Sequence, residues 1–230
     1  MRQVPLPASL LEKAREYAAG TRVPAEPRDA ATVLLLRDGA DGPEVHVMVR
    51  HRGMAFAGGM VAFPGGGVAA SDSADLPADW PERLGAEPEL AAAVVGAALR
   101  EVEEETGVRL TLEDLGLWDA WTTPEFEPRR YRTWFFVARL PAGQEAAELS
   151  TESTSVHWTT AAAALAKVAS GEWSMMPPTY LSVRRLGTFG SVAEVLDVAG
   201  RASVQMFTPR LEGERLTAPE WAATLFGDDL

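Results

Sequence analysis

The spacing of apolar residues along the chain predicts a mixture of strands and helices. Residues 31–38 form an almost continuous apolar run, and residues 43–51 alternate between apolar and polar positions. The GADG stretch that separates them is typical of a turn, so the two runs predict a β-hairpin. Other apolar runs predict strands at Met60–Phe63, Leu115–Trp121, Tyr131–Leu140 and Val156–Trp158.

Apolar residues at helical spacing predict several helices. The first runs from Ser9 to Ala19, with Ser9 and Glu12 at the spacing of a capping box and Gly20 after the end. Later helices are predicted at about Ala161–Ser170, before Gly187, and at Val192–Ala199 behind a capping box of Ser191 and Glu194.

The longest predicted helix runs from Pro88 to Thr106, and Gly107 is its natural stop. Its core stripe has apolar residues four, three and four positions apart, at Ala91, Val95, Ala98 and Val102. Near its end, Glu101, Glu104 and Glu105 lie within one turn of each other. Their side chains can therefore converge on one point.

A polar segment precedes this helix. Residues 69–87 are rich in aspartate and proline, which predicts a loop inserted after the glycine-rich stretch 55–67. The chain shows neither an internal repeat nor a clear linker. We therefore predict one domain over residues 1–230, of mixed α/β class.

Composition narrows the classes of function. The chain has 230 residues, 47% of them hydrophobic, with a net charge of −12, no cysteine and three histidines. Disulfides and thiolate metal sites are excluded, and a histidine-built zinc site or a nucleic-acid polymer as partner is disfavoured. The sequence shows no membrane span and no signal peptide, so we expect a cytoplasmic protein without a membrane partner.

The glutamates near the end of the long helix have two interpretations. Runs of charge are most often solvated helix faces without a function. Alternatively, carboxylate oxygens are the ligands that Mg²⁺ prefers, and Arg100 can hold one carboxylate in place. The glycine-rich FPGGG stretch would also let the backbone approach a metal or a phosphate closely.

The stretch REVEEETGV, residues 100–108, matches the second half of the Nudix box, R-E-U-x-E-E-x-G-U with U aliphatic, at every specified position. FPGG at residues 63–66 supplies the usual lead-in. The chain thus resembles the Nudix hydrolases, which hydrolyse a diphosphate joined to another group. The resemblance implies an α/β/α sandwich around a mixed sheet, here with additional C-terminal helices, and a small nucleotide-type diphosphate as substrate.

The resemblance also implies roles for individual residues. The expected ligands of Mg²⁺ or Mn²⁺ are Glu101, Glu104, Glu105 and the carbonyl of Gly65. Arg100 would orient a glutamate, and it counts with Glu104 and Glu105 as catalytic. In some members a glutamate six residues before a tryptophan binds metal or acts as base. Glu152 stands six residues before Trp158, and a plain exposed glutamate is the equal alternative.

The first half of the box departs from the family pattern twice. Counting from Gly66, the expected glutamate falls on Asp72, and residues 73–99 then separate it from Arg100, where the family has seven residues. We interpret the box, residues 66–108, as split by a surface insertion at about 73–92. This interpretation weakens the family role for Asp72 but leaves the glutamate helix intact.

The split box favours one branch of the family. Together with residues 122–138 and 176–186, it resembles the branch that includes the peroxisomal-type coenzyme A diphosphatases. We therefore expect coenzyme A or acyl-coenzyme A as substrate. ADP-ribose, NADH or another nucleotide diphosphate is the alternative, and a non-catalytic nucleotide-binding module is a second one. The oligomeric state stays open, a homodimer included.

Basic and apolar residues supply candidates for substrate binding. Two clusters could clamp phosphates or be ordinary surface arginines: Arg50 with Arg52, and Arg129 with Arg130. An apolar pocket for a pantetheine or acyl arm could be lined by residues whose commoner role is core packing, namely Met175, Met176, Pro177, Pro178 and Tyr180.

Overall fold

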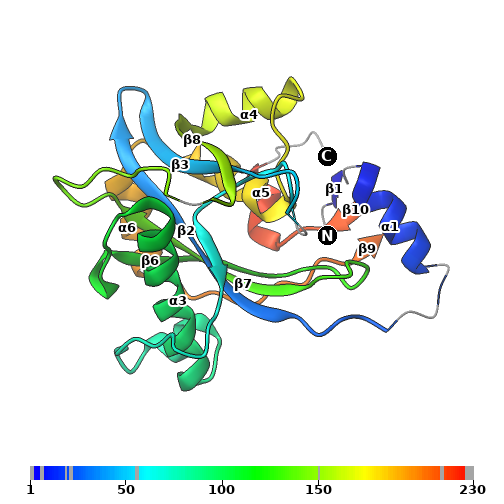
Figure 1. The fold of residues 1–230 in the computed structure, drawn as a ribbon, viewed down its shortest axis with the longest axis horizontal. Coiled ribbons are helices and arrows are strands. Elements are labelled where there is room, and N and C mark those ends of the chain that lie inside the picture. Colours follow the sequence, from blue (N-terminus) through cyan, green and yellow to red (C-terminus); the bar gives the residue numbers. More distant parts are fainter. Residues whose placement is uncertain are drawn as a thin grey trace.

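The computed structural model describes residues 3–5, 8–18, 20, 23–54, 57–149, 151–212 and 215–225 (Figure 1). Its elements in chain order are β1 (Gln3–Pro5), α1 (Ala8–Ala18), β2 (Arg28–Gly39), β3 (Gly42–Arg50), β4 (Val61–Ala62), β5 (Gly65–Gly67), α2 (Trp80–Leu84), α3 (Pro88–Thr106), a 3₁₀ turn (Leu112–Asp114), β6 (Leu115–Thr122), β7 (Tyr131–Arg139), β8 (Ser153–Thr160), α4 (Ala161–Ala169), α5 (Pro177–Leu186), α6 (Val192–Gly200), β9 (Leu211–Glu212), β10 (Arg215–Thr217) and a final 3₁₀ helix (Glu220–Leu225).

The central sheet is mixed and is built around the long strand β2. Its hydrogen-bonded order over the described residues is β4-β3-β2-β7-β6, with β5 also paired to β2 and β8 to β3. Strands β2 and β7 run parallel, whereas β2 and β3 form an antiparallel hairpin that closes between Gly39 and Gly42. The predicted hairpin is therefore present.

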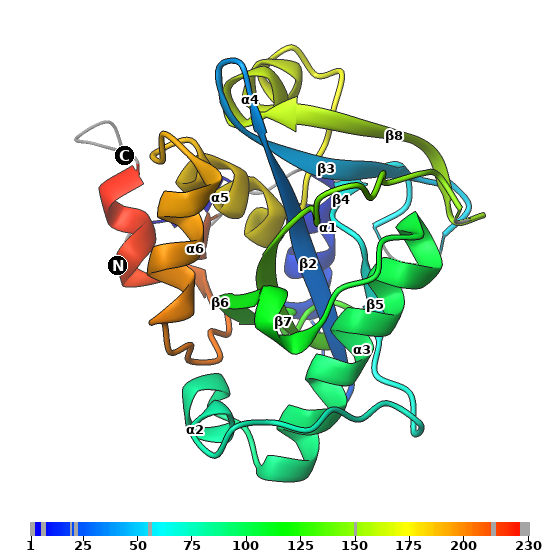
Figure 2. The ribbon, with the colours of Figure 1, turned by 90° about the vertical axis from the view of Figure 1, so that its left-hand side faces the viewer.

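Helices cover both faces of this sheet (Figure 2). Leu34 and Leu36 of β2 pack into one apolar core with α4, α5 and α6, whereas Val33 and Leu35 pack into a second core with α2 and α3. Successive side chains of a strand point to opposite faces, so β2 contributes to both cores. The predicted α/β/α sandwich with additional C-terminal helices is confirmed.

Helix α3 begins and ends at the predicted residues. Pro88 is its first residue, and Gly107 follows it with a φ of +74°, a left-handed conformation that glycine adopts without strain. The apolar stripe of α3 is buried in the second core. These limits place the three glutamates of the box on the last two turns of α3.

The inserted segment differs from the prediction. Residues 88–92 belong to α3, so the insertion ends at Glu87 rather than near residue 92. The segment also carries α2, whose Trp80 and Leu84 are buried against α3. Two apolar side chains four residues apart on a helical turn give the segment an anchor in the core. It is therefore more than a surface excursion.

Both predicted capping boxes need correction. Helix α1 begins at Ala8, so Ser9 is its second residue and not its N-cap. At α6, the Ser191 hydroxyl accepts a hydrogen bond from the Glu194 amide, as a cap should. The Glu194 carboxylate, however, accepts from the Gly190 amide and not from that of Ser191.

A small second sheet joins segments near the two ends of the chain. Strand β1 pairs with β10, and β10 pairs with β9, all antiparallel. No helix in the described part of the chain is long and apolar enough to cross a membrane.

Candidate functional site

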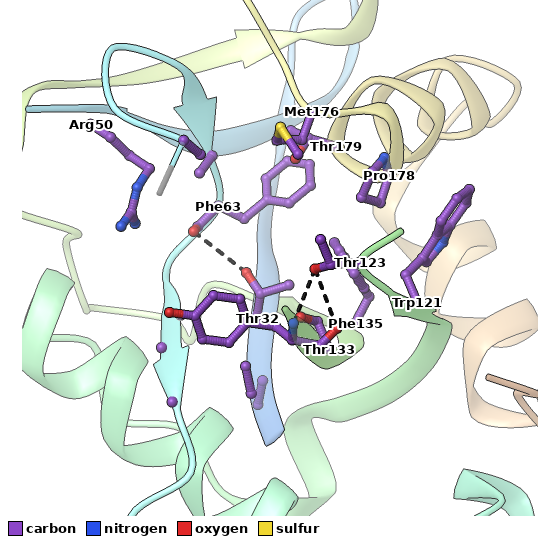
Figure 3. Close-up of a pocket in the computed structure, with 18 of the residues that line it drawn as sticks. Thr32, Arg50, Phe63, Trp121, Thr123, Thr133, Phe135, Met176, Pro178 and Thr179 are labelled. Carbon is purple, nitrogen blue, oxygen red and sulfur yellow. Dashed lines mark hydrogen bonds between the residues drawn. The ribbon is translucent and has the colours of Figure 1, made fainter. Parts of the chain in front are cut away.

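A cavity of about 670 Å³ lies between the end of α3, the glycine strand β5 and the loop that joins β6 to β7. One part of its wall consists of Glu101, Glu104 and Glu105, which we call the carboxylate wall. Another part is aromatic and hydroxyl-bearing, and Figure 3 shows its side chains Thr32, Phe63, Trp121, Thr133 and Phe135. The structure therefore brings the three predicted glutamates to one cavity.

Arg100 connects the carboxylate wall to the inserted segment. Its Nη1 donates to Glu101 Oε1 at 2.7 Å and to Glu104 Oε2 at 3.0 Å. Its Nη2 donates to the carbonyl of Gly67 at 3.0 Å. The guanidinium thus contacts two carboxylates and the glycine strand at once.

Asp72 holds the other side of that guanidinium. Arg100 Nε and Nη2 donate to the two carboxylate oxygens of Asp72 at 2.8 and 2.9 Å, a bidentate pair. This pair lowers the pKa of Asp72 below its usual value. Despite the shorter side chain and the insertion, Asp72 therefore contacts the arginine of the box.

The glycines of β5 allow the carboxylates to approach the backbone. A Cβ on Gly66 would lie 2.4 Å from Glu101 Oε1, and a Cβ on Gly65 would lie 2.3 Å from the Ala31 carbonyl. The Gly65 amide donates to Glu105 Oε2 at 2.8 Å. Side chains at positions 65 and 66 would thus displace the carboxylates or the strand.

Burial affects the protonation of two of the glutamates. Glu105 is only 6% exposed, and burial raises its pKa to about 7 against the opposing effect of the Gly65 amide. Burial likewise raises the pKa of Glu101, although Arg100 counteracts it. Burial removes water from the carboxylates of Glu101 and Glu105, so a nearby cation would stabilise their ionised forms.

The donor set of this wall fits a hard divalent cation, since it consists of carboxylate oxygens beside a backbone strand. The side chains are not already gathered around one point: within the described ranges, no group of three His, Cys, Asp or Glu side chains forms a ready metal site. Arg100 bonds to Glu101 and Glu104 instead. Arg100 contacts one oxygen of each carboxylate, Glu101 Oε1 and Glu104 Oε2, so the second oxygen of each stays available to a cation.

Arg50 and Glu152 also line the cavity. Arg50 Nη2 lies 3.7 Å from Glu152 Oε2, and Arg50 Nε is buried without a hydrogen-bond partner. Figure 3 shows the Arg50 side chain at the edge of the cavity. Arg50 is the one lysine or arginine among the described lining residues.

The other basic candidates lie outside this lining. Arg52 and Arg129 are exposed, and neither contributes to the cavity wall. Arg130 donates from Nε to the Thr123 carbonyl and from Nη1 to the Ala25 carbonyl. The Arg130 guanidinium is therefore already hydrogen-bonded to the backbone.

The apolar candidates divide between the cavity and the core. Met176, Pro177 and Pro178 line the cavity, whereas Met175 is buried in the first core and Tyr180 packs against that core. The structure adds residues that sequence reasoning did not select, chiefly Thr32, Trp121, Phe126 and Glu127. Only the TTPEFEP stretch before the predicted strand of Tyr131 gave a signal for the last two.

A comparison with protein families decides the identity of this site. The model of the NUDIX domain matches residues 26–178, more than half of the chain. The chain belongs to the Nudix family. It is accordingly a hydrolase of phosphorus-containing anhydrides, and the family acts on small-molecule nucleotide substrates, generally with divalent metal ions.

One solved structure supports this assignment. A NUDIX hydrolase from Alicyclobacillus acidocaldarius is 25% identical with a TM-score of 0.63, over 76% of this chain and 97% of that chain. A NUDIX hydrolase from Nitrosomonas europaea is 14% identical with a TM-score of 0.48, over 77% of this chain and 100% of that chain. An Ap4A hydrolase from C. elegans is 17% identical with a TM-score of 0.47, over 70% of this chain and 96% of that chain. The comparison with curated proteins gives no match.

Proposed function

We propose that this Nudix hydrolase uses Mg²⁺ or Mn²⁺ to split the diphosphate of a nucleoside diphosphate linked to another moiety, with coenzyme A or acyl-coenzyme A as the leading substrate. The charge of the cavity carries the proposal. Its described lining contains Arg50 as the basic side chain and five glutamates, Glu101, Glu104, Glu105, Glu127 and Glu152. A diphosphate can enter such a site only with added cations.

The carboxylate wall and the carbonyl of Gly65 would hold these cations. When bound, divalent ions neutralise the diphosphate and lower the pKa of an attached water. Arg100, itself held by Asp72, fixes the orientation of Glu101 and Glu104. Glu152 lines the same cavity and is half-exposed, so it can accept the proton that the attacking water releases.

The remainder of the substrate would extend away from the carboxylate wall. Met176, Pro177 and Pro178 present apolar surface to the cavity, which suits a pantetheine or acyl arm. For the 3′-phosphate of coenzyme A, the exposed Arg129 in the β6–β7 loop is the proposed contact, because Arg130 is engaged by two backbone carbonyls.

A substrate panel tests this proposal. Purified protein is assayed with coenzyme A, 3′-dephospho-coenzyme A, ADP-ribose, NADH and 8-oxo-dGTP, each with Mg²⁺ or Mn²⁺ and each with a chelator. We expect the highest kcat/KM for coenzyme A or its acyl derivatives and no turnover with the chelator. A preference for ADP-ribose or NADH would replace the coenzyme A proposal with the alternative, and binding without turnover would favour a nucleotide-binding module.

A variant locates the 3′-phosphate contact. Arg129→Gln should raise KM for coenzyme A by about tenfold, since a charge-assisted contact contributes about 1.5–3 kcal/mol. KM for 3′-dephospho-coenzyme A should stay unchanged. Arg201→Gln, at an exposed arginine outside the cavity lining, is the matched control. Equal effects on both substrates would remove Arg129 from this role.

A further inference from the structure

Helix α1 supports one end of the cavity, although it lies before the residues that the family model matches. Its Ala14 and Tyr17 pack with Phe126 and Met176. Lys13, on the same helix, donates from Nζ to both carboxylate oxygens of Glu127, at 3.1 and 3.0 Å. We call Phe126, Glu127 and Met176, which all line the cavity, its α1 end.

Glu127 and Glu152 both pair with a cation from a distant segment, but of the two only Glu127 is buried. Its side chain is 4% exposed, whereas that of Lys13 is 45% exposed. Burying an ionised carboxylate is costly unless it is paired, and Lys13 offsets that cost. An ionised carboxylate has about four acceptor positions. Lys13 uses one on each oxygen, so acceptor capacity remains for a group in the cavity.

We propose that Glu127 is a specificity-determining residue for the moiety beyond the diphosphate, and that Lys13 positions it. This inference rests on the proposed function. The Glu127 carboxylate accepts a hydrogen bond from a neutral donor of that moiety and excludes negative charge from the α1 end. Amide N–H and hydroxyl groups of a pantetheine arm have this chemistry, while Phe126 and Met176 contact its methylene groups.

Two single variants test the recognition of the substrate by Glu127 and the positioning of Glu127 by Lys13. Glu127→Gln and Lys13→Met should each raise KM about tenfold, the effect of losing roughly one charge-assisted hydrogen bond. Their kcat should stay within about twofold, because the carboxylate wall is unchanged. Glu16→Gln, at an exposed position on the same helix, is the matched control and should leave both constants unchanged.

A charge exchange separates recognition from docking of the helix. The double variant Lys13→Glu with Glu127→Lys keeps an ion pair but presents a cation to the cavity. We expect it to recover most of the melting temperature that Lys13→Met loses. Its preference should shift from butyryl-coenzyme A toward succinyl-coenzyme A, whose arm ends in a carboxylate, by about tenfold or more relative to wild type.

Two results would overturn the inference. One is an unchanged KM in both single variants, and the other is an exchange variant that is stable yet keeps the wild-type preference, which would leave the pair a purely structural role. Failure of the proposed function looks different. Wild type would then cleave ADP-ribose or NADH but no coenzyme A derivative. The same KM increases are expected for that substrate, because the hydroxyl groups of its ribose are also neutral hydrogen-bond donors.

Discussion

The three carboxylates of α3 differ in their surroundings at the scale of single residues. The side chain of Glu104 is 58% exposed, whereas Glu105 is buried beside the Gly65 amide. We expect Glu104→Gln and Glu105→Gln each to lower kcat/KM by about 10²–10³, the loss of roughly 3–4 kcal/mol of charge stabilisation in the transition state. Steady-state kinetics measures this loss.

The fold should tolerate both substitutions. Glutamine keeps an acceptor for the Gly65 amide and removes a buried charge at position 105. Thermal unfolding followed by circular dichroism checks that the variants are folded. Turnover near the wild-type value in both folded variants would contradict the assignment of these glutamates.

Asp72 acts on the site through Arg100. Asp72→Ala leaves the guanidinium free to bond more closely to Glu101 and Glu104, the proposed metal ligands. Loss of such an outer contact typically costs about 10–100-fold in metal affinity, and we expect a loss of that size in a Mn²⁺ titration. Asp72→Glu, which restores the residue usual in the box, should bind Mn²⁺ as wild type does. Equal affinity in the alanine variant would show that the bidentate pair is dispensable.

His46 gives the molecule a dependence of stability on pH. The ring is buried beside Trp158, and both of its nitrogens lack hydrogen-bond partners. Burial lowers the pKa of His46 to about 4, with a smaller contribution from Arg37. The unfolded chain, with the usual pKa of 6.5, therefore binds the proton more readily than the folded protein does.

The stability associated with neutral His46 is present above the unfolded pKa and is lost as the pH falls from 6.5 toward 4. The loss is on the order of 3 kcal/mol. Between about pH 7.5 and about pH 4.5, urea unfolding should show less loss of stability in His46→Leu than in wild type, because the buried Glu105, with its raised pKa, changes stability in the opposite direction in both proteins. Parallel pH dependence in the two proteins would contradict this account.

At the scale of elements, Gly96 determines how closely the inserted segment packs on α3. A Cβ at this position would lie 2.5 Å from the Ser73 backbone nitrogen. In an exposed helix interior, Gly→Ala gains about 1 kcal/mol. Here we expect Gly96→Ala to lower the melting temperature, because the methyl group must push backbone away. Gly200→Ala, whose Cβ would meet nothing within 4 Å, is the control and should not destabilise.

At the scale of the whole molecule, metal binding should stabilise the fold. The net charge of −12 and the lining of the cavity both favour cations. A ligand that binds only the folded state at about 100 times its Kd adds about 2.7 kcal/mol. We expect Mg²⁺ or Mn²⁺ to raise the melting temperature, a chelator to reverse the increase, and Glu105→Gln to reduce it. An unchanged wild-type melting temperature at saturating metal would contradict a site on this wall.

The sequence by itself determined the β2–β3 hairpin, the limits of α3 and the candidate carboxylates. The limits of α3 follow from an apolar stripe, Pro88 and Gly107, all of which act within a few residues of chain. The same local spacing predicts that Glu101, Glu104 and Glu105 share one face. Counting along the box even located Asp72, although only the structure showed its contact with Arg100.

The tertiary structure decided which of the many charged and apolar residues meet. Trp80 and Leu84 are buried because α2 returns onto α3, and Arg130 is engaged because its loop passes Thr123 and Ala25. Lys13 and Glu127 are 114 positions apart. No periodic pattern pairs such residues, because their contact depends on how whole elements pack and not on the spacing within any one of them.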